Sequence, residues 1–230
     1  GTDLEHLSQV CTAMEKAALI VGSSILSISA GGGLPVPYRE GESFVDIDAY
    51  FKLWNATRHR LATQFGHSIS LEIEPGRFLV AESGYLISEI RAIKTAGENT
   101  FYLLDAGFNN LARPILYSAY HPMAICPAES EKGGSGLGGT REVIVAGPLC
   151  ESGDIFTQEA GGVVARSTLP EAAIGDYLVI GCAGAYGYVM ANNYNSKPLV
   201  AEVLIENGKP QLVRRRQTYD DLIGLESIPR

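Results

Sequence analysis

The strongest constraint on the fold is a change in the pattern of apolar residues near residue 80. Before it, helix-like and strand-like segments alternate, as in a parallel sheet or an α/β barrel. After it, short strand-like runs are separated by turns rich in Gly, Asn and Pro, which favours an antiparallel β-barrel or sandwich. The sequence therefore predicts an α/β portion over residues 1–80 and a β-rich domain over residues 81–230.

The predicted elements follow this division. Two helices are expected over residues 3–21 and 46–65, with Asp3 as the N-cap of the first. Later strands are expected at 85–93, 101–105, 142–146, 154–157, 176–180, 199–205 and 211–213, with a short final helix near 219–225. The Gly-rich stretch 127–141 matches a nucleotide-binding spacing only by accident, because no strand precedes it and no helix follows. It is expected to be a mobile surface loop.

Composition narrows the function classes. The net charge of −8 argues against binding to nucleic acid or to anionic membranes. No apolar run is long enough to cross a bilayer, and the polar start Gly1-Thr2-Asp3 does not indicate a signal peptide. The cysteines are far apart and form no CxxC pair, which favours reduced thiols in a cytoplasmic protein and no metal site; they are Cys11, Cys126, Cys150 and Cys182.

Two loops follow the last two strands of the α/β portion. Gly31-Gly32-Gly33 comes after strand 25–29, and Glu74-Pro75-Gly76-Arg77 comes after strand 70–73. In α/β barrels, ligands bind at the C-terminal ends of the strands, and glycines let main-chain N–H groups approach a phosphate. The alternatives are a tight turn without a ligand and a structural ion pair between Glu74 and Arg77.

The β-rich portion offers further candidates. Cys150 lies in a Gly/Pro-flanked turn beside Glu151 and Asp154, where two carboxylates favour the neutral thiol and so a proton donor rather than a nucleophile. Arg113 and Tyr117 are spaced to lie one helical turn apart and to reach one anion. Tyr186 lies between small residues, from which its hydroxyl could reach a phosphate. A buried structural cysteine, exposed polar residues and a core tyrosine are the alternatives.

Taken together, these motifs resemble one family, the bacterial diaminopimelate decarboxylases of the alanine-racemase-like (fold type III) pyridoxal-phosphate decarboxylases. The resemblance covers the chain except the Gly-rich stretch. It implies that the α/β portion is the last βα units of a TIM-type (β/α)8 barrel. The motifs that carry it occur in this order: Ala30-Gly-Gly-Gly-Leu-Pro35, Glu74-Pro-Gly-Arg77, Asp105-Ala-Gly-Phe-Asn109, Arg113-Pro-x-x-Tyr117, Gly147-Pro-Leu-Cys-Glu-Ser-Gly-Asp154, Gly184-Ala-Tyr186 and Asn193-Tyr-Asn-Ser196.

The resemblance also implies residue roles. Glu74 would keep the pyridine nitrogen of the cofactor protonated, and the segments Gly31–Gly33 and Glu74–Arg77 would bind the cofactor. Cys150 would be the general acid that reprotonates the substrate's α-carbon, and Glu151 would contact the distal ammonium. Residues implied to hold the cofactor phosphate or the distal end of the substrate are Arg77, Arg113 and Tyr117, and Tyr186 is implied to contact both cofactor and substrate.

The activity implied is the decarboxylation of meso-2,6-diaminopimelate to L-lysine and CO2, the last step of lysine synthesis. In this family Cys150 and Glu151 complete the site of a neighbouring subunit, so a homodimer is expected. A complete barrel takes roughly 250 residues, and no Lys here matches the family's Schiff-base motif. We therefore expect the chain to be the C-terminal portion of a longer enzyme, inactive alone.

Two other hypotheses remain open. A paralogue in the same family would decarboxylate D-lysine or D-ornithine, which lack the distal carboxylate. A non-catalytic relative would use the fold to bind a partner. The presence of Glu74, Cys150 and the three glycines argues against the second.

Overall fold

The computed structural model describes residues 4–128 and 138–229, and the chain divides into two compact units, residues 1–83 and 84–230. The predicted cap Asp3 and most of the Gly-rich stretch 127–141 lie outside the described residues. Each unit has its own hydrophobic core. The two units are therefore described separately.

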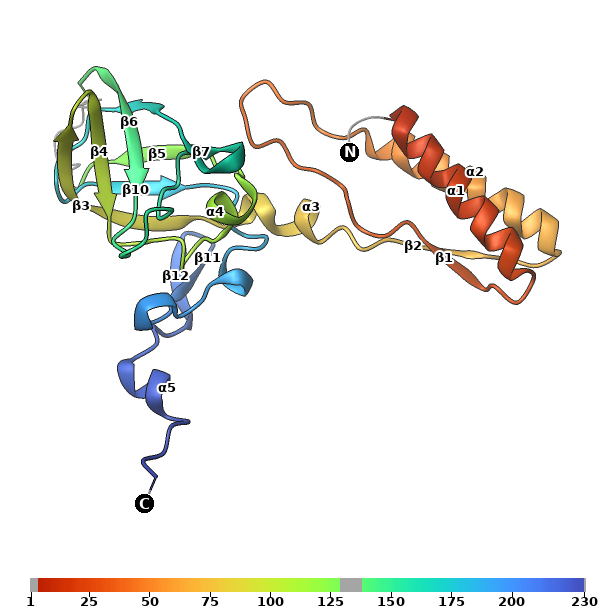
Figure 1. Cartoon of the computed structure of the whole chain (residues 1–230). Helices are drawn as coiled ribbons and strands as arrows, with labels where there is room; N and C mark the ends of the chain where they lie inside the picture. The colour runs from red at the N-terminus through yellow and green to blue at the C-terminus, as the bar shows by residue number, and fades with distance from the viewer. Residues whose placement is uncertain (1–3, 129–137, 230) are drawn as a thin grey trace. The chain divides into compact units, whose positions relative to one another are not determined.

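The first unit alternates helix and strand. Helices α1 and α2 lie side by side (Figure 1), and the apolar side chains between them include Cys11, Trp54 and Leu61. The Asp46 side chain accepts a hydrogen bond from Ala49 N and caps α2, which ends at Gly66 in the left-handed conformation. The elements are α1 (Leu4–Val21), β1 (Ser27–Ser29), α2 (Ile47–Phe65), β2 (Ser70–Glu72), α3 (Gly76–Val80) and the 3-10 helix η1 (Ala81–Ser83).

Strands β1 and β2 are parallel neighbours. Ser27 pairs with Ser70 and Ser29 with Glu72, so the strands run in the same direction in register. Their carboxyl ends consequently lie at one edge, as parallel pairing requires. The two loops singled out in the sequence both begin at this edge.

The second unit is built on a six-stranded sheet in the order β5-β10-β3-β4-β6-β9. The outer strands β5 and β9 also contact each other, so the sheet is a nearly closed barrel. Its strands are β3 (Leu86–Ala96), β4 (Asn99–Leu104), β5 (Met123–Cys126), β6 (Thr140–Ala146), β9 (Ser167–Pro170) and β10 (Tyr177–Ile180). Figure 1 shows β3, β4, β6 and β10 wrapping around the core of this unit.

The expectation of a purely antiparallel sheet is wrong. β4 and β6 pair in parallel, with Phe101 opposite Ile144, because the chain crosses through α4 and β5 between them instead of turning back in a hairpin. The remaining elements are α4 (Arg113–Tyr117), β7 (Gln158–Glu159), η2 (Ala160–Gly162), β8 (Val163–Val164), η3 (Tyr188–Met190), η4 (Tyr194–Ser196), β11 (Glu202–Glu206), β12 (Lys209–Arg214) and α5 (Tyr219–Ile223).

One predicted strand is also wrong. Residues 154–157 form no strand, and only Ile155 makes an isolated bridge to Ala146. The Asp154 side chain accepts hydrogen bonds from the main-chain N–H groups of Leu149 and Phe108, and these bonds hold the segment in a turn. Among the described residues, no helix has the length and apolar character needed to cross a membrane.

Candidate functional site

The glycine loop and the Glu74 segment meet at the carboxyl edge of β1 and β2. Ala30 N donates to Glu72 O at 2.8 Å, and Glu74 N donates to Gly31 O at 2.8 Å, so the pairing continues past both strands. Ser29 then connects the two loops, since its Oγ donates to Glu74 Oε1 and accepts from Gly31 N, each at 3.0 Å. The structure thus brings these predicted site residues together.

Close packing explains the glycines. A Cβ on Gly32 would lie 2.9 Å from Glu74 O, closer than real side chains allow. Gly31 and Gly33 have φ of 63° and 86°, the left-handed region that glycine tolerates. Among the described residues, the N–H groups of Gly32 and Gly33 have no hydrogen-bond partner. The loop therefore presents exposed donors without side chains, which suits an anion such as phosphate.

The Glu74 carboxylate is exposed at the same edge. Ser29 holds Oε1, while Oε2 has no hydrogen bond within the described part of the chain. Pro75 precedes α3, Gly76 is its first residue, and half-buried Arg77 follows in its first turn. This edge therefore combines the Glu74 carboxylate as a fixed acceptor, the N–H donors of the glycine loop, and the positive charge of Arg77.

In the second unit, buried Asp154 organises the turn that carries Cys150. Its Oδ2 accepts from Leu149 N and its Oδ1 from Phe108 N, both at 2.7 Å. A Cβ on Gly147 would lie 2.3 Å from the carboxylate, so glycine is required there. Burial raises the pKa of Asp154, and the two N–H donors oppose that rise. Cys150 is consequently held exposed at the surface of a fixed turn.

Glu151 lies next to the thiol and is fully exposed. Its Oε1 accepts from Gly153 N and from Ser152 Oγ, each at 3.2 Å, and Tyr194 Oη donates to Oε2 at 3.3 Å. The hydrogen bond from Gly153 N, followed by that from Ser152, lowers the pKa of this carboxyl. Tyr194 also packs on Phe108, with ring centroids 4.8 Å apart. Glu151 is therefore an ionised carboxylate in a fixed orientation.

Arg113 lies buried at the start of α4. Its Nη1 is 3.0 Å from His121 Nε2, and its guanidinium is 5.9 Å from the centroid of the Tyr186 ring. Tyr117, at the other end of α4, is 66% exposed. The structure thus brings Arg113 and Tyr186 together. Tyr117 lies on the same helix as Arg113 but is exposed.

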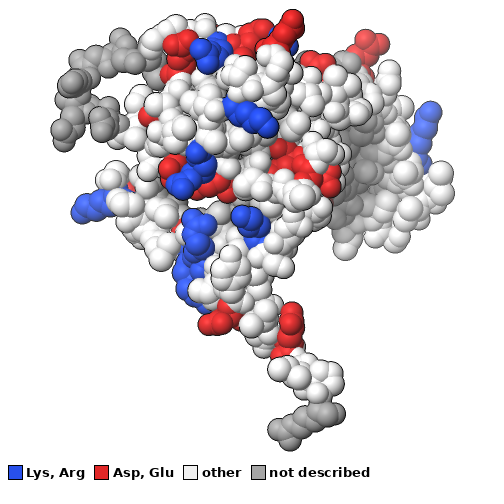
Figure 2. Space-filling model, turned by 60° about the vertical axis from the view of Figure 1, so that its left-hand side comes forward, with Lys and Arg blue, Asp and Glu red and all other residues white. Residues whose placement is uncertain are grey.

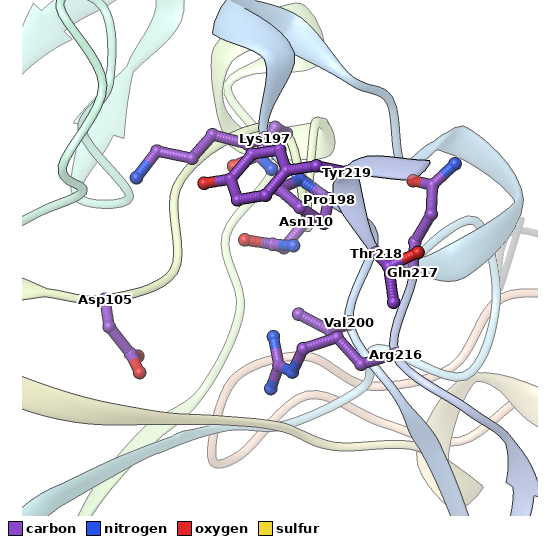
Figure 3. Close-up of a pocket in the computed structure, with 10 residues that line it drawn as sticks. Asp105, Asn110, Lys197, Pro198, Val200, Arg216, Gln217, Thr218 and Tyr219 are labelled. Carbon is purple, nitrogen blue, oxygen red and sulfur yellow. The ribbon is translucent and has the colours of Figure 1, made fainter. Parts of the chain in front are cut away.

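A pocket of about 480 Å³ lies elsewhere in the second unit. Figure 3 shows Asp105 and Arg216 pointing into it from separate segments, with Lys197 and Tyr219 at one side. The Asp105 carboxylate is itself fixed, because Oδ1 accepts from Ser88 Oγ and Glu89 N. None of the site residues predicted from the sequence lines this pocket.

Sequence reasoning missed three structural partners of the predicted site. Ser29 joins the two loops of the first unit, Asp154 fixes the Cys150 turn, and His121 contacts Arg113. His121 lies close to the Arg113 motif in sequence, and Asp154 is the last residue of the motif that contains Cys150. Their roles depend on which groups contact them in the folded protein, so their spacing along the chain does not predict these hydrogen bonds.

Replacing Asp154 with asparagine is expected to destabilise the protein by about 1–3 kcal/mol, because the amide NH2 would face a buried N–H donor and leave it unpaired. Asp176 is the matched control, since its carboxylate also accepts two main-chain N–H groups but is only half-buried. Urea unfolding of the full-length protein measures both variants. Equal losses for Asp154→Asn and Asp176→Asn would contradict the account.

Acid should destabilise the protein through His121. Burial is the main cause that lowers its pKa to about 4, below the ordinary value near 6.5. The unfolded chain therefore binds a proton at a higher pH than the folded chain. Stability should fall by up to about 3 kcal/mol as pH decreases from about 6.5 to about 4. Unfolding measured across this range should show a shallower loss in His121→Gln, and an identical slope would contradict this assignment.

Figure 2 shows acidic and basic side chains interspersed on the face in view. Within residues 4–128 and 138–229, no group of three or more His, Cys, Asp or Glu side chains is arranged to hold a metal ion.

Most of the chain matches the model of a known protein family. Residues 13–184 match the family described as pyridoxal-dependent decarboxylase, C-terminal sheet domain. The match includes the glycine loop, Glu74, Arg113 and Cys150.

Individual relatives extend the match to the whole chain. The diaminopimelate decarboxylase of Escherichia coli strain K12 is 52% identical over 99% of this chain and 54% of its own length. That of Streptomyces coelicolor is 47% identical over 100% of this chain and 51% of its own. The chain spans about half the length of the curated relatives it matches.

Solved structures agree with these relatives. A crystal structure of diaminopimelate decarboxylase superposes with a TM-score of 0.93 at 52% identity, covering 98% of this chain and 53% of that one. A second, from M. jannaschii in co-complex with L-lysine, has a TM-score of 0.79 at 29% identity, covering 98% of this chain and 48% of that one.

Proposed function

The chain belongs to the pyridoxal-dependent decarboxylase family, and we propose that the whole protein converts meso-2,6-diaminopimelate to L-lysine and CO2. The observation that carries this proposal is the 52% identity to the Escherichia coli diaminopimelate decarboxylase across 99% of the chain. Because the chain matches about half of that relative, the proposal concerns the longer protein. Its first unit would be the last βα units of a (β/α)8 barrel, with residues 81–230 as the sheet domain.

The edge of β1 and β2 fits pyridoxal phosphate. The free N–H groups of Gly32 and Gly33 suit a phosphate, and the missing side chains leave room for it. The Glu74 carboxylate, oriented by Ser29, suits a protonated ring nitrogen. Arg77 adds a positive charge in the first turn of α3. These residues would hold the cofactor, which when bound supplies the sink for the electron pair left on the α-carbon as CO2 departs.

Cys150 would then deliver the proton. Breaking the bond between the α-carbon and the carboxylate leaves an electron pair on carbon, and the thiol S–H transfers its proton there. The resulting thiolate recovers a proton from solvent. The rigid turn around Asp154 supports this role, because a proton donor acts only from within hydrogen-bond reach.

The other end of the substrate would be held by charge. Arg113 suits the distal carboxylate, since a guanidinium pairs with a carboxylate through two parallel hydrogen bonds. The ionised Glu151, held by Gly153 and Tyr194, suits the distal ammonium. Tyr186 packs near Arg113, and Tyr117 is exposed on the same helix as Arg113, where each would add a hydroxyl contact.

A substrate assay tests the proposal. The full-length protein with pyridoxal phosphate should release CO2 from meso-diaminopimelate and form L-lysine, with a much lower rate on D-lysine. D-lysine lacks the distal carboxylate that Arg113 would bind. A preference for D-lysine or D-ornithine would instead favour the paralogous decarboxylase. A protein that binds no pyridoxal phosphate and turns over none of these substrates would favour the non-catalytic relative.

The whole protein would act as a homodimer in the cytoplasm, with Cys150 and Glu151 serving the neighbouring subunit. Mixing two inactive variants tests this arrangement. Unfolding and refolding Cys150→Ala together with Glu74→Ala should restore about a quarter of the wild-type activity, since half of the dimers are mixed and each has one intact site. No recovery from a mixture shown to contain mixed dimers would contradict a shared site.

A further inference from the structure

We propose that His121 is a positioning residue that holds Arg113 in the orientation needed to bind the substrate's distal carboxylate. This inference rests on the proposed function, which places Arg113 at that carboxylate. It adds a residue that does not touch the substrate but acts through Arg113.

The contact is direct and buried. His121 is 1% exposed and Arg113 is 6% exposed, and Arg113 Nη1 lies 3.0 Å from His121 Nε2. Side chains this buried have few other conformations open to them. The imidazole therefore restricts the position of one end of the guanidinium.

The contact between His121 and Gly181 determines the tautomer of the imidazole. His121 Nδ1 lies 2.9 Å from Gly181 O, and a carbonyl oxygen can only accept, so Nδ1 carries the proton. Nε2 is then the acceptor, and Arg113 donates to it. Burial, with the Arg113 charge adding to it, lowers the pKa of His121 to about 4, so the ring stays neutral near pH 7.

A neutral partner matters for binding. A carboxylate in place of His121 would also hold Arg113, but it would cancel the positive charge that attracts an anionic ligand. A neutral imidazole accepts one N–H donor and leaves that charge in place. The ring of Tyr186 and the main chain of Gly181 also face this pair.

His121 also connects Arg113 to the loop that carries Tyr186. Gly181, which accepts from His121, follows β10, and its N–H donates to Pro122 O at 2.8 Å. The same loop continues to Tyr186, whose ring lies 5.9 Å from the guanidinium. One histidine thus fixes a helix and a loop that both contribute residues to the proposed distal subsite.

Two variants and two ligands test the inference in the full-length holoenzyme. L-Lysine retains the distal carboxylate of diaminopimelate, whereas cadaverine is the same diamine without it. His121→Leu removes the acceptor, and His121→Gln keeps an oxygen that can accept from Arg113. Binding of both ligands is measured by calorimetry, beside KM and kcat for meso-diaminopimelate.

We expect His121→Leu to weaken L-lysine binding roughly ten- to hundredfold, as expected for a lost hydrogen bond to a charged group. In the same variant, KM for meso-diaminopimelate should rise by a similar factor with little change in kcat. Its affinity for cadaverine should stay within about twofold of the wild-type value. His121→Gln should recover part of the affinity for L-lysine. Equal losses for both ligands, or no loss for either, would overturn the inference. If His121→Leu does not fold, unchanged L-lysine affinity in Arg113→Lys, which cannot make the same forked contact, would overturn it. A wild-type enzyme inactive on diaminopimelate would instead refute the proposed function.

Discussion

Replacing Cys150 with alanine is expected to lower kcat of the full-length enzyme by about 10²–10⁴-fold, the range typical for loss of a positioned general acid. The thiol is exposed on a turn whose shape is set by Asp154 and not by the cysteine itself. Stability and cofactor binding should therefore stay unchanged. Initial rates of CO2 release at saturating substrate measure the effect.

Cys126 provides the matched control. It is also a free, exposed cysteine of the second unit, but it lies at the end of β5 and carries no predicted role. Cys126→Ala should keep kcat within about twofold of wild type, because a surface substitution of this kind changes little. A Cys150→Ala enzyme that retains half of the wild-type kcat would eliminate Cys150 as the proton donor.

Replacing Glu74 with glutamine is the second large effect. The amide has the same shape but no negative charge, so it no longer favours a proton on the ring nitrogen. We expect kcat to fall by about 10²–10³-fold, similar to the loss of other fixed electrostatic contacts in active sites. The effect should fall on kcat more than on KM, and the bound cofactor, measured by absorbance, should stay close to one per chain.

Glu72 is the control for that experiment. Its side chain is exposed two residues earlier, and only its main-chain oxygen takes part in the pairing of the two loops. Glu72→Gln removes the same charge from the same edge. If both variants lose activity equally, the effect comes from the general charge of this edge and not from a contact at Glu74.

Much of this architecture follows from local sequence. The helix over 46–65 has a capping Asp46 and a terminal Gly66, and apolar residues at helical spacing, so its bounds differ little from those predicted. The glycine loop and the Glu74 segment were predicted to share an edge, since both follow strands of an α/β pattern.

The remaining features depend on contacts between distant segments. The parallel pairing of β4 with β6 is set by a crossover of more than thirty residues, which no periodicity reveals. In the sequence, Asp154 is one of two acidic residues in its turn, and only the structure shows that Phe108 N, 46 residues away, donates to its carboxylate. His121 likewise bonds to Gly181, 60 residues further along. Such partners are specified by the folded core, so sequence spacing alone could not predict them.

Growth of a bacterial strain that lacks its own diaminopimelate decarboxylase tests the central claim most directly. The full-length gene should restore growth without added lysine, and so should the Cys126→Ala version. Versions carrying Cys150→Ala or Glu74→Gln should leave the strain dependent on lysine, although they accumulate as folded protein. The account is contradicted if the folded wild-type protein does not restore growth, or if the Cys150 and Glu74 variants restore it as well as wild type.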